Sequence, residues 1–178
     1  MNCHIRSAVP LSLIVPLLLS TACGTGNAVS ADQAVVAAGR VKPPDPQALR
    51  KFAEAYTAAW NSRSPELLAS KFATDGMLII NNGAPARGRA AIAQVAQSFM
   101  STFPDVVVTM DTLEAGVNGA AYRWTLTGTN SGPGGNGNTV RISGTEVWQL
   151  NDAGQIRISD RHFDKADYDR QLGLAAAH

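Results

Sequence analysis

The chain has 178 residues, of which 45% are hydrophobic and 16% are charged, and its formal net charge is +1. This balance argues against a nucleic-acid-binding protein, which needs a clustered basic face. The two cysteines, Cys3 and Cys23, both lie near the N-terminus, so the sequence predicts no disulfide in the folded part of the chain.

Residues 1–22 are predicted to be an export signal. Arg6 precedes an apolar run from Ala8 to Leu19. This run is followed by the short segment Ser20-Thr21-Ala22-Cys23. A bilayer-spanning helix needs ~20 apolar residues, and this run is shorter. The small residues before Cys23 resemble a bacterial lipobox, which implies a lipid on Cys23 and a protein anchored to the cell membrane or outer membrane. An ordinary cleaved signal peptide with an incidental cysteine is the alternative.

The rest of the chain divides into a tether, one domain and a tail. Residues 23–45 are mostly Gly, Ala, Val and Pro with scattered polar residues, a composition typical of a flexible tether. Residues 46–173 have the length of one small domain, and residues 174–178 form the tail. Removal of residues 1–22 takes away one basic residue, Arg6, and leaves 14 basic and 14 acidic residues.

Three helices are predicted at the start of the domain. Asp45 followed by Pro46 is a helix start, and an apolar stripe continues to about Asn61. A second, short helix opens at Ser64 and carries apolar residues as far as Phe72. A turn at Asp75-Gly76, a short strand and a loop precede a third helix. The strand spans Met77 to Ile80, the loop begins at Asn81, and the third helix runs from about Gly88 to Met100.

Four strands and a last helix are predicted in the remainder. Turns at residues 116–119 and 151–154 and a flexible Gly-rich loop at 132–137 separate the strands, which predicts an antiparallel meander. Helices followed by such a meander indicate an α+β fold. The predicted strands are Val106–Glu114, Ala121–Thr129, Thr139–Leu150 and Gln155–Asp164, and the helix is Lys165–Leu172.

The last two strands carry the candidate site. Alternation along the final strand places Asp160, His162 and Asp164 on the same face as two isoleucines, so we expect these three polar side chains to face the interior. The same reasoning on the preceding strand turns Glu146 and Trp148 inward. A bulge in the final strand would reverse its faces, and acidic residues at strand ends often lie at a solvated rim.

Several short motifs resemble the SnoaL-like polyketide cyclase family of the nuclear transport factor 2-like superfamily. They are Phe103-Pro104-Asp105, Tyr122-Arg123-Trp124, Gly128-Thr129-Asn130-Ser131-Gly132, Gly154-Gln155-Ile156, Phe163-Asp164 and Gln171-Leu172-Gly173. The resemblance implies a curved antiparallel sheet wrapped against three N-terminal helices as a cone, the cystatin-like α+β barrel, with a pocket inside. It also implies catalysis without metal or cofactor, with Asp164 as the general base.

Three hypotheses about function follow. The first is a cofactor-independent cyclase, isomerase or lyase acting on an apolar carbonyl compound, in which His162 or Asn130 polarises an oxygen. The second is a lipid-anchored protein that binds a small apolar molecule without catalysis. The third is an interaction module of the cell envelope, such as a homodimer formed through the outward sheet face. The expected ligand-binding residues are Asp160, Glu146, Asn130, Trp148, Tyr56 and Trp60.

Overall fold

A computed structural model of the protein describes residues 44–174. The predicted export signal, the lipidation site Cys23 and the tether up to residue 43 lie outside this range, as do residues 175–178. No described helix is both long enough and apolar enough to span a membrane.

Helices α2 and α3 begin where the sequence places their caps. The Asp45 carboxylate accepts hydrogen bonds from the backbone N–H groups of Gln47 and Ala48, and α2 (Pro46–Asn61) follows. The Ser64 hydroxyl caps α3 (Pro65–Ala69) in the same way. Since α3 ends at Ala69, the prediction that Phe72 belongs to this helix is wrong, and Phe72 is the first residue of a strand.

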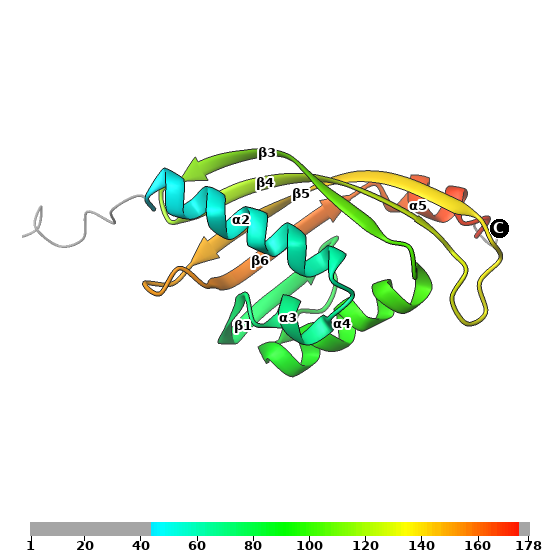
Figure 1. The fold of residues 1–178 in the computed structure, drawn as a ribbon, viewed down its shortest axis with the longest axis horizontal. Coiled ribbons are helices and arrows are strands. Elements are labelled where there is room, and N and C mark those ends of the chain that lie inside the picture. Colours follow the sequence, from blue (N-terminus) through cyan, green and yellow to red (C-terminus); the bar gives the residue numbers. More distant parts are fainter. Residues whose placement is uncertain (1–43, 175–178) are drawn as a thin grey trace, which may run out of the picture. The chain divides into compact units, whose positions relative to one another are not determined.

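The third helix, α4 (Gly88–Thr102), buries Ile92, Ala96 and Met100. Helices α4 and α2 lie on the same side of the sheet (Figure 1). Their buried apolar side chains belong to the hydrophobic core. The three predicted N-terminal helices are therefore confirmed.

The six strands form one curved sheet in the order β2-β1-β6-β5-β4-β3. Strands β3 to β6 are the predicted meander, but β1 pairs with β6 in parallel, so the expectation of a wholly antiparallel sheet is wrong. The β2 strand was not predicted. Long-range pairing of this kind is invisible in local patterns because α4 separates β1 from the rest of the sheet. The bounds are β1 (Phe72–Ile80), β2 (Ala86–Arg87), β3 (Val107–Gly116), β4 (Gly119–Thr129), β5 (Thr139–Leu150) and β6 (Ile156–Phe163).

A bulge near the start of β6 changes the faces of that strand. Leu150 of β5 pairs with Ile156, whereas the adjacent Gln149 pairs with Ile158, which leaves Arg157 as an extra residue. The pairing between β1 and β6 is irregular at the same level, and the predicted turn at Asp75-Gly76 lies inside β1 instead of before it. Bulges increase twist and bend a strand, which agrees with the curvature seen in Figure 1.

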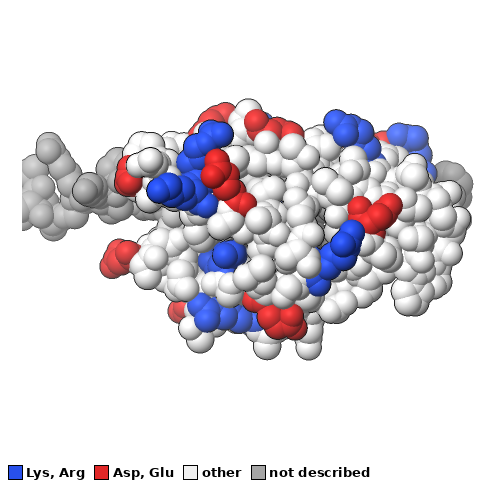
Figure 2. Space-filling view, in the orientation of Figure 1, with Lys and Arg blue, Asp and Glu red and all other residues white. Residues whose placement is uncertain are grey.

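The last helix, α5 (Lys165–Gln171), packs against the N-terminal part of β5. The Gln171 amide substitutes for a strand neighbour, because its Oε1 accepts from the Arg141 N–H at 2.7 Å and its Nε2 donates to the Arg141 carbonyl at 3.0 Å. On the surface shown in Figure 2, acidic and basic side chains are interspersed.

Candidate functional site

The concave face of the sheet is lined by alternate residues of β5 and β6. On β5, Val140, Ile142, Glu146 and Trp148 are buried, so the predicted inward face of this strand is confirmed. On β6, the buried residues after the bulge are Ser159 and Arg161, and the alternate residues face outward.

The prediction that Asp160, His162 and Asp164 face the interior is wrong, because the extra residue in β6 reverses the alternation. Asp160 and His162 form a pair on the outer face, with His162 Nε2 2.9 Å from Asp160 Oδ1 and side chains that are 42% and 45% exposed. The exposed Asp164 is the N-cap of α5 and accepts a hydrogen bond from the Asp167 N–H at 2.9 Å.

Two other residues singled out in the sequence also lie away from the concave face. Asn130 supports the loop between β4 and β5, where its N–H donates to the Asn138 carbonyl and its side chain donates to Asn136. Arg123, whose orientation the sequence left open, points outward, with its Nε 3.7 Å from Glu114 Oε1 and a side chain that is 53% exposed.

Glu146 and Arg161 form a buried ion pair at the centre of the concave face. They are opposite one another in the register of β5 and β6, and Arg161 Nη2 contacts Glu146 Oε1. The other carboxylate oxygen, Oε2, accepts hydrogen bonds from the Tyr56 hydroxyl at 2.8 Å, Trp148 Nε1 at 2.9 Å and the Ser159 hydroxyl at 2.9 Å. The carboxylate is thus surrounded by four donors, which is what a buried charge requires.

The pKa values around the pair follow from burial and from its charges. Burial alone would lower the pKa of Arg161, but the Glu146 carboxylate raises it above its ordinary value. Burial and the Glu146 charge together hold the pKa of Tyr56 well above its usual range. The nearby Trp60 Nε1–H lowers the pKa of Tyr56, although its distance and angle to the hydroxyl do not make a hydrogen bond. Burial raises the pKa of Tyr122 to about 12.

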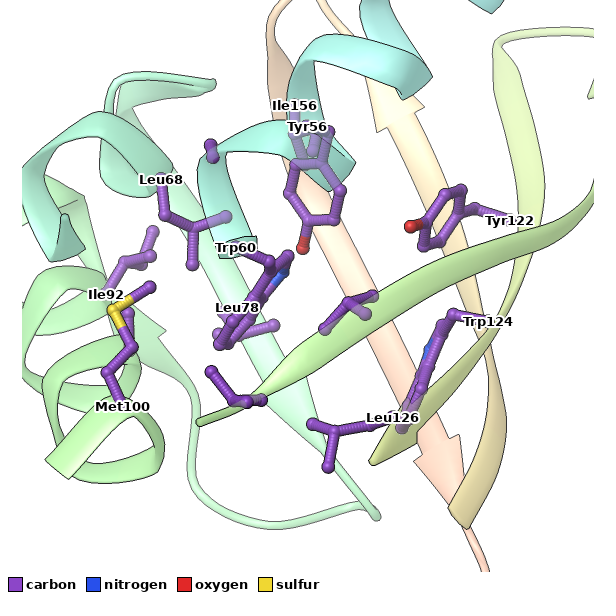
Figure 3. Packing of buried hydrophobic residues seen from close by; sticks show 14 of the residues in the cluster. Tyr56, Trp60, Leu68, Leu78, Ile92, Met100, Tyr122, Trp124, Leu126 and Ile156 are labelled. Atoms are coloured by element: carbon purple, nitrogen blue, oxygen red, sulfur yellow. The ribbon is translucent and has the colours of Figure 1, made fainter. Parts of the chain in front are cut away.

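Aromatic rings enclose the Arg161 guanidinium. Its carbon lies 4.6 Å from the ring centroid of Trp60 and 5.2 Å from that of Trp124, within the range of cation–π attraction. The two indoles come from α2 and β4 (Figure 3). Trp124 lies against Gly144 of β5, where any Cβ atom would overlap the indole ring.

Next to Arg161, a second aromatic group packs around Tyr56. The Tyr122 and Trp148 rings are stacked with centroids 4.7 Å apart, and Tyr56 meets both of them edge-on. The Tyr56 hydroxyl also accepts from Arg161 Nη2 at 3.2 Å, which links this aromatic group to the ion pair.

Three buried donors in this cluster have no hydrogen-bond partner among residues 44–174. They are Arg161 Nε, Trp124 Nε1 and Trp60 Nε1. An unpaired buried donor costs about 1–3 kcal/mol, so three of them within one cluster call for a specific explanation. An arrangement of this kind can donate hydrogen bonds to an acceptor that enters the cluster.

The structure therefore brings together four of the predicted ligand-binding residues, Tyr56, Trp60, Glu146 and Trp148. The central Arg161 is not among the residues predicted from the sequence. The sequence did contain a clue to this residue. A buried carboxylate such as Glu146 needs a cation nearby, and Arg161 is a basic residue on the neighbouring strand. Trp124 and Ser159 were missed as well.

Two hollows on the surface lie away from this cluster of buried donors. One has a volume of about 380 Å³ and lies beside Asp105, Arg141 and Gln171. The Asp105 carboxylate there accepts from Thr129, and the Gln171 amide is bonded to the Arg141 backbone. The other, of about 400 Å³, lies between the β3–β4 hairpin and β5. Within residues 44–174, no group of three or more His, Cys, Asp or Glu side chains is placed to hold a metal ion.

Comparison with known proteins relates the chain to one family. The model of the SnoaL-like domain matches residues 53–158. No curated protein sequence matches the chain. Similar solved structures include a hypothetical protein from Catenulispora acidiphila with a ketosteroid isomerase-like fold, in complex with trimethylamine. It is 19% identical with a TM-score of 0.64, and the match covers 72% of this chain and 96% of that one.

Two further solved structures are similar to this chain. A putative SnoaL-like polyketide cyclase from Jannaschia sp. is 12% identical, with a TM-score of 0.64 and coverage of 75% of this chain and 97% of the other. SalBIII, described as an epoxide hydrolase/cyclase-like enzyme of pyran ring formation in salinomycin, is 20% identical, with a TM-score of 0.61 and coverage of 69% and 95%. At these identities the likeness concerns the fold, and the predicted α+β class is confirmed.

Proposed function

Because the chain belongs to the SnoaL-like domain family, we propose that its folded part is a binding domain for a small, largely apolar molecule. The ligand would sit on the concave face of the sheet, beside the buried pair of Glu146 and Arg161.

The three unpartnered N–H groups around Arg161 are the observation that carries this proposal. A folded protein rarely leaves buried donors unpaired unless something else supplies the acceptor. A ligand oxygen at this position would supply one, and the surrounding aromatic and aliphatic side chains would contact its apolar part.

We propose binding rather than proton transfer by Asp164. A general base must come within hydrogen-bond reach of the proton that it removes, and the exposed Asp164 carboxylate instead accepts the Asp167 N–H. The only carboxylate in the cluster is Glu146, whose Oε2 accepts three hydrogen bonds and whose Oε1 contacts Arg161 Nη2. Asp164 therefore lies away from the interior, and the charge of Glu146 is compensated by Arg161.

Entry of a ligand requires side-chain movement, since Trp60 is 1% and Trp124 is 2% exposed. Each indole meets a half-buried ring edge-on, Phe99 in the case of Trp60 and Phe163 in the case of Trp124, with centroids 6.2 Å apart. These two phenylalanines are the side chains whose displacement would admit a molecule, and association should accordingly be slower than for an open site.

The domain is further proposed to act outside the cytoplasm on a lipid anchor. The support is the sequence of residues 1–23, with its short apolar run and the small residues before Cys23. We expect the wild-type protein to partition into detergent and Cys23→Ser to move to the aqueous phase. A wild-type protein found in the aqueous phase would refute the anchor without affecting the binding proposal.

Native mass spectrometry of the full chain purified from bacterial envelopes tests the binding function. Trp124→Phe removes one unpaired donor and keeps an aromatic ring, whereas Arg123→Met changes an exposed neighbour on the outer face. We expect a small-molecule adduct on the wild type and on Arg123→Met, with markedly lower occupancy on Trp124→Phe. Absence of any adduct from all three proteins, or equal occupancy in Trp124→Phe, would contradict the proposal.

A further inference from the structure

We infer that the β3 edge, the unpaired side of β3 at residues 111–115, is a second binding surface for an extended segment of another protein. That segment would carry basic side chains on one face and join the sheet as a further strand through backbone hydrogen bonds. The inference is independent of the ligand proposed for the concave face.

The β3 edge presents backbone groups that face away from β4. As the last strand of the sheet, β3 has a neighbour on one side alone (Figure 1). Alternate residues of an antiparallel strand bond to opposite neighbours, and the Leu150 N–H donates to the Asn118 carbonyl, so even-numbered residues of β4 bond to β5. The β3 residues opposite such positions, Leu113 and Ala115, therefore turn their N–H and C=O groups outward.

Side-chain amides cover unpaired strand backbone elsewhere in this fold. Earlier on the same edge, the Asn61 amide accepts from the Val108 N–H at 2.7 Å and donates to its carbonyl at 2.9 Å. The Gln171 amide covers the start of β5 in the same way. No described side chain bonds to the backbone of Leu113 or Ala115. An edge left open can accept another strand, which is why most proteins cover theirs.

The charges on the β3 edge determine which strand fits it. Glu114 and Asp111 are both exposed on the outer face. Glu114 has Arg123 at 3.7 Å, whereas Asp111 accepts from the neutral Thr125 hydroxyl, so the edge is acidic. Opposite charges on adjacent strands contribute about 0.2–1 kcal/mol per pair, which favours Lys or Arg in the added strand. On the inner face, the half-buried Leu113 offers an apolar contact.

A second copy of the chain fits the β3 edge less well than a basic segment. Two β3 strands paired through these edges would bring Asp111 and Glu114 of both copies to one junction. Like charges on adjacent strands are destabilising by about the amount that opposite charges gain. The partner that the edge favours is therefore a different chain, in which basic and apolar residues alternate.

NMR titration of the ¹⁵N-labelled full chain tests the inference with two acetylated heptapeptides, TVKVKVT and its acidic counterpart TVEVEVT. We expect TVKVKVT to shift the Leu113 and Ala115 amide signals in a saturable way, and TVEVEVT to bind about 10-fold more weakly. Ala115→Pro removes an edge-facing N–H without touching the pairing with β4, so the Leu113 shift should disappear. Ala115→Val keeps this N–H and is the matched control.

Glu114→Gln is a second variant, which leaves the backbone intact and should weaken TVKVKVT about 3-fold. No shift of either amide at about 2 mM TVKVKVT, or unchanged binding to Ala115→Pro, would refute strand addition at the β3 edge. Equal binding of the two peptides would refute the basic partner. Slow hydrogen exchange of both amides without peptide, appearing only at high protein concentration, would assign the edge to a second copy and overturn the inference.

Discussion

Replacement of Glu146 by glutamine is the most direct test of the buried ion pair. The side chain keeps its shape, and its amide oxygen can still accept from Tyr56, Trp148 and Ser159, but Arg161 loses its counter-charge. Removing one partner of a buried pair costs about 3–5 kcal/mol, because an uncompensated charge stays in the interior. We expect Glu146→Gln to lower the free energy of unfolding by this amount.

The matched control is Glu114→Gln on the outer face. Glu114 lies 3.7 Å from Arg123 with a side chain that is 64% exposed, and exposed pairs contribute about 0–1 kcal/mol. Both variants can be measured by urea unfolding, provided that the slope with denaturant is the same as in the wild type.

A double variant separates the lost charge from lost packing. Glu146→Gln combined with Arg161→Met removes the stranded cation and retains side chains of similar length, so we expect it to recover at least half of the loss. If Glu146→Gln costs no more than Glu114→Gln, or if the double variant is less stable than the single one by the full cost of a second deletion, the ion pair does not have the role described.

Three further predictions follow from named contacts. Asp164→Asn should retain the α5 cap and Asp164→Ala should lose about 1 kcal/mol of unfolding free energy, whereas a catalytic Asp164 would lose activity in both variants. Gly144→Ala should cost about 1–3 kcal/mol in the same urea assay, because its Cβ would overlap the Trp124 ring, and a neutral result would refute the packing described. Hydrogen bonds from the Thr129 N–H and hydroxyl lower the pKa of Asp105 below its ordinary value. The stabilisation from Asp105 should therefore be complete above about pH 4 and lost as the pH falls through the lowered folded-state pKa; Asp105→Asn should flatten this acid limb, and an NMR titration with an unshifted pKa would contradict it.

Local patterns were enough to predict most of the elements. Asp45 and Ser64 cap helices where expected, and α2 buries the stripe that includes Tyr56 and Trp60. The alternation on β5 correctly turned Glu146 inward. These features depend on residues within a few positions of one another, and the physics of capping and amphipathicity acts over the same distance.

The faces of β6 could not be derived in this way. Whether Asp160 or Arg161 points inward depends on one extra residue at Arg157, and that bulge arises from the pairing of β6 with two neighbours. Without the bulge, Asp160 would face the interior beside Glu146, and two carboxylates would be buried together. With it, the carboxylate meets a cation, which is the arrangement of lower energy.

The sequence by itself thus determined the α+β class, the three helices and an inward acid on β5. Only the tertiary structure decided which residue meets that acid, and it moved the candidate site from Asp164 at the end of β6 to Arg161 in its middle. The physical reason is that strand register is a property of the paired sheet. A shift of one residue exchanges the two faces of a strand, and the alternation of apolar and polar residues in the sequence does not reveal it.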